Sequence, residues 1–359
     1  EDLSRQTIAS QATTLVHPAE FYVALQQPKE MFVAANAPIR AAVAAVEPSG
    51  ARRVGVSVSV DLLARTWATA TEATGEDGLH YESRAIDKVV ATCEAKTTAD
   101  VAGCDLRPTE AGFYIVRARA ADKRGNPVAS SYGVYVSGDS ARVAWPVYDG
   151  PRLELVTDKE SYEVGDVAKV LVKSPFKEAE ALVTVERQGI SREERVTVRG
   201  SMPVFSIPVT AEMWPNVFVS VQLVKGRSAP PPPADAKKGK GADVGGPSFR
   251  IGWAEISVNP EGRRLKVDVK PSKKDHRPGD EVDVDLVVTD RAGKGVHADV
   301  AFYAVDEGVL MLTGYKTPDP LPVFAARRSL SVAPIESRDN LARILRLGRG
   351  PGEDKGDEG

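Results

Sequence analysis

The stretch that decides the fold is DKESYEVGDVAKVLV, at residues 158–172. It contains Lys159, the aromatic Tyr162 and the pair Gly165-Asp166, and then apolar and polar residues alternate up to Val172. Such alternation is typical of a β-strand with one face on a core, and a Gly-Asp pair is typical of the turn that leads into it.

The same order returns elsewhere in the chain. Residues 272–286 read SKKDHRPGDEVDVDL, and residues 29–36, KEMFVAAN, form a weaker copy that is shifted by one residue. Recurrence at a domain-sized interval predicts tandem homologous domains rather than a solenoid.

Further alternating stretches predict strands at residues 53–62, 132–136 and 265–269. Residues 216–224 are partly apolar on both faces, which predicts a central strand, and we expect another strand at 300–305. Two segments between strands share the form Asp-x-x-Gly-x-x-Val, at 122–128 and 290–296. Aspartate can accept hydrogen bonds from its own turn and glycine supplies positive φ. The sequence therefore predicts an all-β protein of tandem antiparallel sandwiches.

Length and composition narrow the class of protein. The chain has 359 residues, 42% hydrophobic and 27% charged, which is enough for two to four globular domains. A formal net charge of −3 argues against nucleic acid as a partner. No apolar run reaches the ~18 residues of a membrane helix. Since the chain begins at Glu1 without a methionine, we interpret it as part of a longer protein.

The two cysteines, Cys93 and Cys104, flank a polar stretch that has the composition of a turn between strands. We expect them to form a disulfide, which implies an oxidising compartment, although two free buried thiols remain the alternative. A zinc site would need close Cys or His pairs, so we expect no metal.

The sequence contains no recognisable catalytic constellation, and we expect neither an enzyme nor a cofactor. The Gly165-Asp166 and Gly279-Asp280 pairs could suggest a cation site, and Asp306-Glu307 an acid/base pair. We interpret all three as turns. We interpret the large aromatic residues as fillers of cores or domain junctions rather than as a carbohydrate platform; these are Trp67, Trp145, Trp214 and Trp253.

Two segments break the strand pattern. Residues 228–247 are rich in Pro, Lys and Gly and predict a mobile loop. Residues 336–359 contain a short helical stripe and then glycine and charge, which predicts a flexible segment.

Four strings together resemble bacterial alpha-2-macroglobulins: residues 161–176 (SYEVGDVAKVLVKSPF), 181–187 (ALVTVER), 215–227 (PNVFVSVQLVKGR) and 304–320 (AVDEGVLMLTGYKTPDP). The resemblance covers most of the chain from Leu153 onward and is looser before it. It implies macroglobulin-like, fibronectin-like sandwich domains and a role in trapping proteases. In the family a protease cuts an exposed bait region, and a rearrangement then exposes a thioester that links the protease covalently.

The resemblance implies the following division: 1–18, the last strands of a truncated domain; 19–138 and 139–260, two complete macroglobulin-like domains; 261–335, an incomplete one; 336–359, the start of the bait region. Mobile segments are where proteases cut, and the arginines there suit trypsin-like enzymes; they are Arg338, Arg343, Arg346 and Arg349. The thioester motif Cys-Gly-Glu-Gln follows neither cysteine. We therefore expect a non-catalytic fragment of a broad-spectrum endopeptidase inhibitor, monomeric and periplasmic or otherwise extracytoplasmic, from a parent that could carry a lipid anchor. A structural or adhesive sandwich array and a carbohydrate-binding module are the alternatives.

Overall fold

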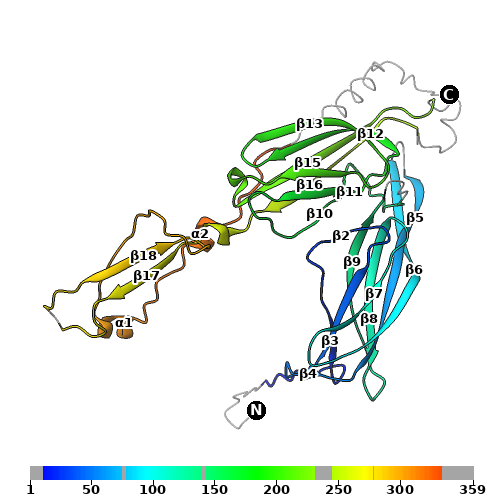
Figure 1. Cartoon of the computed structure of the whole chain (residues 1–359). Helices are drawn as coiled ribbons and strands as arrows, with labels where there is room; N and C mark the ends of the chain where they lie inside the picture. The colour runs from blue at the N-terminus through cyan, green and yellow to red at the C-terminus, as the bar shows by residue number, and fades with distance from the viewer. Residues whose placement is uncertain (1–10, 75–77, 139–142, 231–244, 278, 334–359) are drawn as a thin grey trace, which may run out of the picture.

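The structure is a computed structural model that describes residues 11–74, 78–138, 143–230, 245–277 and 279–333. Figure 1 shows two β-sandwiches that meet at an angle and a two-stranded hairpin that projects away from them. The predicted class, all-β with tandem antiparallel sandwiches, is confirmed. Within the described ranges, no helix is long and apolar enough to cross a membrane.

The first sandwich consists of two facing sheets. One contains β1 (Tyr22–Leu25), β3 (Ile39–Val46), β4 (Arg52–Arg53) and β7 (Ala102–Leu106). The other runs in the order β2 (Phe32–Ala34), β9 (Pro127–Ser137), β8 (Gly112–Ala121), β5 (Ser57–Thr74) and β6 (Gly78–Lys96). The pairs are antiparallel except β2 with β9, which is parallel.

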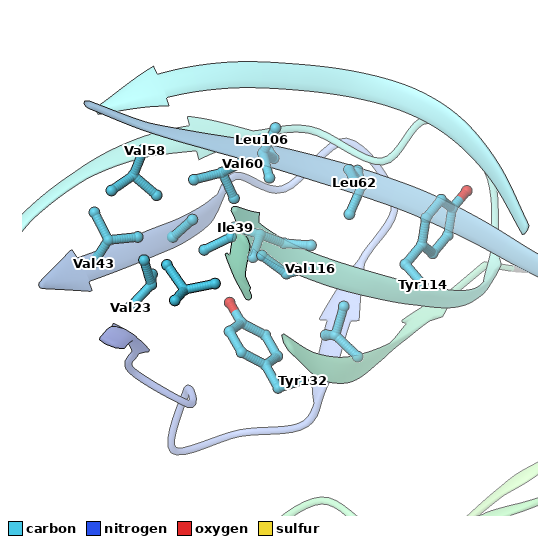
Figure 2. Packing of buried hydrophobic residues seen from close by; sticks show 14 of the residues in the cluster. Val23, Ile39, Val43, Val58, Val60, Leu62, Leu106, Tyr114, Val116 and Tyr132 are labelled. Carbon is cyan, nitrogen blue, oxygen red and sulfur yellow. The ribbon is translucent and has the colours of Figure 1, made fainter. Parts of the chain in front are cut away.

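The core of the first sandwich follows the predicted alternation (Figure 2). Val58, Val60 and Leu62 of β5 are fully buried against Val43 of the opposite sheet. Burying one such side chain contributes about 1.5–3 kcal/mol. The prediction of a strand at 53–62 is wrong at its N-terminal end: β5 begins at Ser57. Gly55 has a φ of 83°, and Val54 is 61% exposed.

The second sandwich repeats this architecture. One sheet contains β10 (Leu155–Thr157), β11 (Val167–Val172) and β14 (Val204–Pro208). The other runs in the order β13 (Ile190–Arg199), β12 (Glu178–Glu186), β15 (Asn216–Lys225) and β16 (Ser248–Ser257). The prediction that residues 216–224 form a central strand is confirmed, since β15 pairs with both β12 and β16.

The three copies of the repeated motif share one backbone feature. Gly165 and Gly279 have φ values of 98° and 92°, and Asn36 takes the same left-handed conformation with a φ of 66° in the copy that is shifted by one residue. In the two full copies the aspartate that follows accepts from the backbone N–H three residues earlier. Asp166 accepts from Glu163 at 3.2 Å and Asp280 from Arg277 at 2.9 Å. The interpretation of both Gly-Asp pairs as turns is confirmed.

The two Asp-x-x-Gly turns also have matching geometry. Asp122 Oδ1 accepts from the N–H groups of Arg124 and Asn126, each at 2.9 Å, and Gly125 has a φ of 85°. Asp290 Oδ1 accepts from Ala292 and Lys294 at the same distance, and Gly293 has a φ of 80°. The mechanism predicted from the sequence is therefore confirmed in both turns.

A cluster of large side chains fills the junction between the sandwiches. Trp145, in the segment that joins them, packs with Tyr135 of β9 and Leu171 of β11, while Trp67 and Phe113 line its edge. The Trp145 indole N–H donates to the carbonyl of Ser201 at 2.6 Å. This confirms the junction role expected for these two tryptophans.

The remaining elements form a hairpin with two short helices and no core. Among the described strands, β17 (Lys266–Pro271) pairs only with β18 (Val284–Thr289). Two short helices, α1 (Glu307–Thr313) and α2 (Leu321–Phe324), follow. None of the described residues from 260 to 333 is buried. The strand expected at 300–305 is wrong: these residues form no strand, because none of the described strands pairs with them, and Phe302 and Tyr303 are exposed. The last strands of a truncated domain were expected at 1–18; residues 1–10 lie outside the described residues, and 11–18 form no strand.

Candidate functional site

The segment from 325 to 333 leads into the expected bait region. The arginines predicted as cleavage sites (Arg338, Arg343, Arg346 and Arg349) lie outside the described residues. Most of the loop expected at 228–247 also lies outside them. Its ends meet within the β15–β16 hairpin, where Ser228 N–H donates to the carbonyl of Gly245 at 2.9 Å.

After α2 the chain turns back and runs along the second sandwich, as the orange-red trace in Figure 1 shows. Its main anchor is Asn216, the first residue of β15, which is 1% exposed. The side-chain oxygen of Asn216 accepts from the Arg328 N–H at 2.8 Å, and its Nδ2 donates to the Arg328 carbonyl at 3.0 Å. One amide side chain thus satisfies both backbone groups of Arg328, as a neighbouring strand would.

Arg187, the residue after β12, organises the same end of the sheet. Its backbone carbonyl accepts from Ser331 N–H at 2.8 Å. Its guanidinium donates to the carbonyls of Trp214 and Asn216 at 3.0 and 3.1 Å, which holds the start of β15 in place. The contact to Ser331 and the support of Asn216 therefore come from a single residue.

The side chain of Arg327 makes two contacts on the sheet. Its Nε donates to Glu255 Oε2 of β16 at 2.6 Å, and its guanidinium carbon lies 5.5 Å from the centre of the Phe218 ring. Phe218 and Glu255 are register partners on β15 and β16, and Glu186 of β12 is the partner of Phe218 on the other side. The guanidinium of Arg327 therefore lies near a cross-strand row in which the Phe218 ring stands between Glu186 and Glu255.

This outer face of the sheet is unusually well buried for its polarity. Thr184, Glu186 and Ser220 are each less than 5% exposed, although the neighbouring Val183, Val185 and Val219 point into the core on the other face. Thr184 donates to Glu186 Oε1. Glu186 Oε2 has no hydrogen-bond partner within the described part of the chain. Buried polar groups normally require partners, so this face is suited to hold polar chain rather than to face solvent.

Sequence reasoning missed Asn216 and Arg187. The available signal was a polar residue at the first position of a mostly apolar central strand, and an arginine directly after the strand at 178–186. Neither signal identifies the partner, which is 112 residues away in the chain for Asn216.

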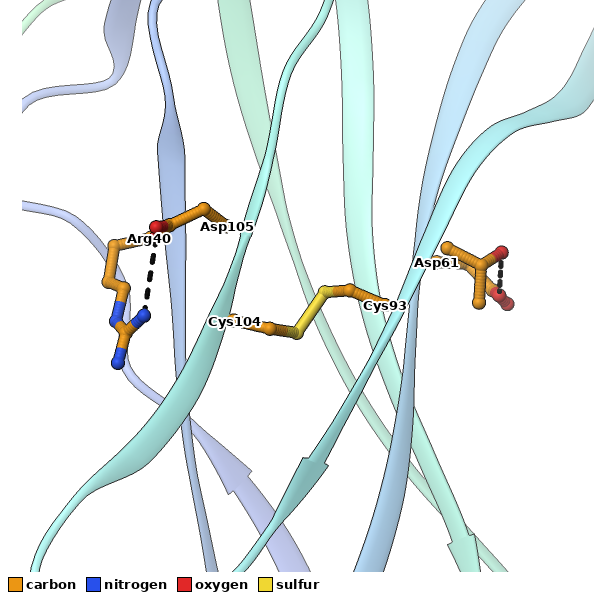
Figure 3. Close-up of a disulfide and its surroundings, with 6 residues drawn as sticks. Arg40, Asp61, Cys93, Cys104 and Asp105 are labelled. Atoms are coloured by element: carbon orange, nitrogen blue, oxygen red, sulfur yellow. Dashed lines mark hydrogen bonds and ion pairs between the residues drawn. A yellow bond between two sulfur atoms is a disulfide. The ribbon is translucent and has the colours of Figure 1, made fainter.

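The two cysteines are joined in the structure and link the two sheets of the first sandwich (Figure 3). Cys93 lies on β6 and Cys104 on β7, which belong to different sheets, and the two residues are 11 apart in sequence. On one side of the disulfide Arg40 forms an ion pair with Asp105 at 3.4 Å. On the other side lies the buried Asp61, which accepts a hydrogen bond from the Thr92 hydroxyl at 3.2 Å. The disulfide thus links the two sheets of the sandwich through β6 and β7. These two strands belong to different sheets and, in the described part of the chain, are not hydrogen-bonded to each other.

The other candidates for chemistry have structural roles. Asp306 is the N-cap of α1 and accepts from Gly308 N–H at 2.8 Å, and Glu307 is exposed in the first turn of that helix. Both residues are solvent-exposed, as expected, but the interpretation of the pair as a turn is wrong, because the pair begins a helix. Across the described ranges, no group of three or more His, Cys, Asp and Glu side chains could hold a metal ion.

Of the four tryptophans, Trp253 on β16 is 38% exposed and lines an open groove of about 680 Å³ with Arg152 and Glu154. Trp214 packs on the second core beneath the guanidinium of Arg263, whose carbon lies 4.6 Å from the ring centre. Trp67 and Trp145 are in the junction, so the indoles do not gather into one exposed platform.

Comparison with known proteins agrees with the family predicted from the sequence. Residues 153–312 match the alpha-2-macroglobulin bait region domain. An alpha-2-macroglobulin homolog of Nostoc is 28% identical over 298 residues, which are 82% of this chain and 15% of that protein. The alpha-2-macroglobulin of Xylella fastidiosa strain Temecula1 is 30% identical over 196 residues, or 54% of this chain and 11% of that protein. The native structure of Escherichia coli alpha-2-macroglobulin covers 91% of this chain and 22% of its own at 18% identity, with a TM-score of 0.30.

Together with the tandem sandwiches, the match of residues 153–312 makes this chain similar to the alpha-2-macroglobulin class. The predicted resemblance to the bacterial members of that family is confirmed. The chain spans 15% of the length of the Nostoc relative and 11% of the length of the Xylella relative.

Proposed function

We propose that this chain is the bait-bearing part of a broad-spectrum bacterial endopeptidase inhibitor and has no catalytic activity of its own. The observation that supports it most is the match of residues 153–312 to the bait region domain, in a chain that continues into an arginine-rich polar tail. In this proposal a target protease cuts within residues 336–359, and the candidates for cleavage are Arg338, Arg343, Arg346 and Arg349.

The domain division proposed is the one expected from the sequence, with complete macroglobulin-like domains at 19–138 and 139–260 and an incomplete one at 261–335. The exposure of residues 260–333 supports the last assignment. Val267 and Val269 of β17 and Leu286 of β18 are each 40% or more exposed, and a lone hairpin is marginally stable in water. Strands from another part of the protein would complete this domain.

Covalent capture of the protease would come from elsewhere in the protein. Neither Cys93 nor Cys104 begins a Cys-Gly-Glu-Gln motif, and the two are bonded to each other. A disulfide of this kind is typical of oxidising compartments, which supports an extracytoplasmic location. We propose a monomer whose partners are proteases.

Limited proteolysis with trypsin and elastase, with the earliest cuts mapped by mass spectrometry, tests the proposal. We expect the first cuts to fall between 334 and 359 while both sandwiches stay intact. First cuts within 228–247 or in a sandwich, with the tail resistant, would leave only a scaffold role. The arginine-to-glutamine variant at the four candidate positions is the matched control, because it should slow trypsin and leave elastase unaffected.

A further inference from the structure

We propose that residues 325–331 are a strap that is recognised by a seat on the outer face of the second sandwich. We further propose that this seat sets the N-terminal limit of the protease-susceptible segment. The seat consists of Asn216, Arg187, Phe218 and Glu255. The strap and its seat do not depend on the proposed function, whereas the limit that they set rests on it.

The backbone of the strap is unavailable to a protease. A protease binds its substrate as an extended strand and needs the N–H and C=O groups near the scissile bond. Asn216 occupies both of these groups on Arg328, and Arg187 occupies the N–H of Ser331. To release Arg328, the chain would have to leave the buried amide of Asn216 without partners, which is costly.

The side chains explain why an arginine occupies this place. The guanidinium of Arg327 lies above Phe218 and pairs with Glu255, whose side chain is 27% exposed. Glu186 adds a second carboxylate to the same row of the sheet. A cationic, planar group fits a ring flanked by carboxylates, so the seat selects a basic segment.

The consequence is a difference between arginines that look alike in the sequence. Arg327 and Arg328 are exposed, and both would be ordinary trypsin sites in an unpinned chain. With the strap seated, cleavage after Arg328 requires the strap to leave first, whereas cleavage after a later arginine does not. A cut in the tail would then leave the N-terminal stub attached to the second sandwich.

The experiment measures trypsin cleavage after Arg328 in the whole chain, relative to cleavage in 334–359. We expect the cut after Arg328 to be at least tenfold slower than the first tail cut, and Asn216→Ala to remove about that factor. Gln222→Ala, on the same strand and face but beyond the seat, is the matched control and should change neither rate.

A charge exchange separates recognition from damage to the fold. Glu255→Arg or Arg327→Glu alone should speed the cut after Arg328 several-fold, and the double variant should restore the slow rate. Rapid cleavage after Arg328 in the unaltered chain, or a double variant as fast as the single ones, would overturn the seat even if the tail is cut as proposed. A tail that resists trypsin while Arg328 stays protected would instead overturn the bait proposal and leave the seat standing.

Discussion

The centre of the Trp145 indole ring, in the segment between the two sandwiches, lies 5.6 Å from the centre of the Trp67 indole ring on β5. These residues are 78 positions apart, and their contact joins the first sandwich to the second. Around them lie Phe113, Tyr135 and Leu171, and the ammonium group of Lys173 lies 5.3 Å from the Trp145 ring. The junction is therefore a small aromatic core rather than a solvated linker.

We expect Trp145→Ala to loosen the two sandwiches. Removing a buried tryptophan costs about 3–5 kcal/mol, because it leaves a cavity, and here it also removes the indole hydrogen bond to the Ser201 carbonyl. Denaturant unfolding should show a lower midpoint, and small-angle scattering a broader distance distribution. Trp253→Ala, at a partly exposed site, should cost about 1 kcal/mol or less. Equal effects of the two substitutions would contradict a structural joint at Trp145.

The Cys93–Cys104 disulfide should stabilise the first sandwich by about 3 kcal/mol, the value typical for a loop of this size. Reductant should therefore lower the unfolding midpoint of the unaltered chain. The double variant Cys93→Ser and Cys104→Ser should start at the lower midpoint and be insensitive to reductant. If reductant leaves the unaltered chain unchanged while mass spectrometry shows free thiols, the cross-link contributes nothing.

Asp122 should make stability depend on pH in the acid range. The side-chain amide of Asn126 is the main cause that lowers the pKa of Asp122 from 3.8 to about 2. Burial opposes it, and the backbone N–H groups of Asn126, Glu20 and Arg124 add to it. Because the folded-state pKa is the lower one, the stabilisation is present above about 3.8 and is lost as the pH falls through about 2.

The Asp122→Asn variant isolates this effect. It should melt below the unaltered chain at pH 5, and the difference between the two midpoints should shrink steadily towards pH 2. Calorimetry of both proteins across this range measures it, and other carboxylates cancel in the difference. A midpoint difference that stays constant with pH would show that the charge of Asp122 is not what stabilises the turn.

The β17–β18 hairpin should open far more readily than either sandwich. Val267, Val269 and Leu286 of the hairpin are exposed, and so are Met311 and Leu312 of α1, the latter at 90%. We expect amide protons of β17 and β18 to exchange at least a hundredfold faster than those of β12 and β15. Hydrogen exchange with mass spectrometry compares the two regions in one sample. Slow exchange in the hairpin would mean that it has found a partner, such as a second copy of the chain.

The strand alternation and the turns of this fold could be predicted from short stretches of sequence. The alternation at Val58, Val60 and Leu62, the Gly-Asp turns before β11 and β18, and the Asp122 and Asp290 turns all depend on residues within a few positions of each other. Their physics is local: a period of two places side chains on one face, and glycine accepts a positive φ. The error at 300–305 has the converse reason, since an apolar run becomes a strand only where another strand can pair with it.

The sequence by itself determined the class of fold, the repeated sandwich unit and the resemblance to bacterial alpha-2-macroglobulins. Only the tertiary structure decided which distant residues meet. Trp67 reaches Trp145 because β5 and the linker pack together, and Asn216 reaches Arg328 because the chain folds back over the sheet. Such contacts depend on how whole sheets and segments are placed, and no local pattern in the sequence encodes that placement.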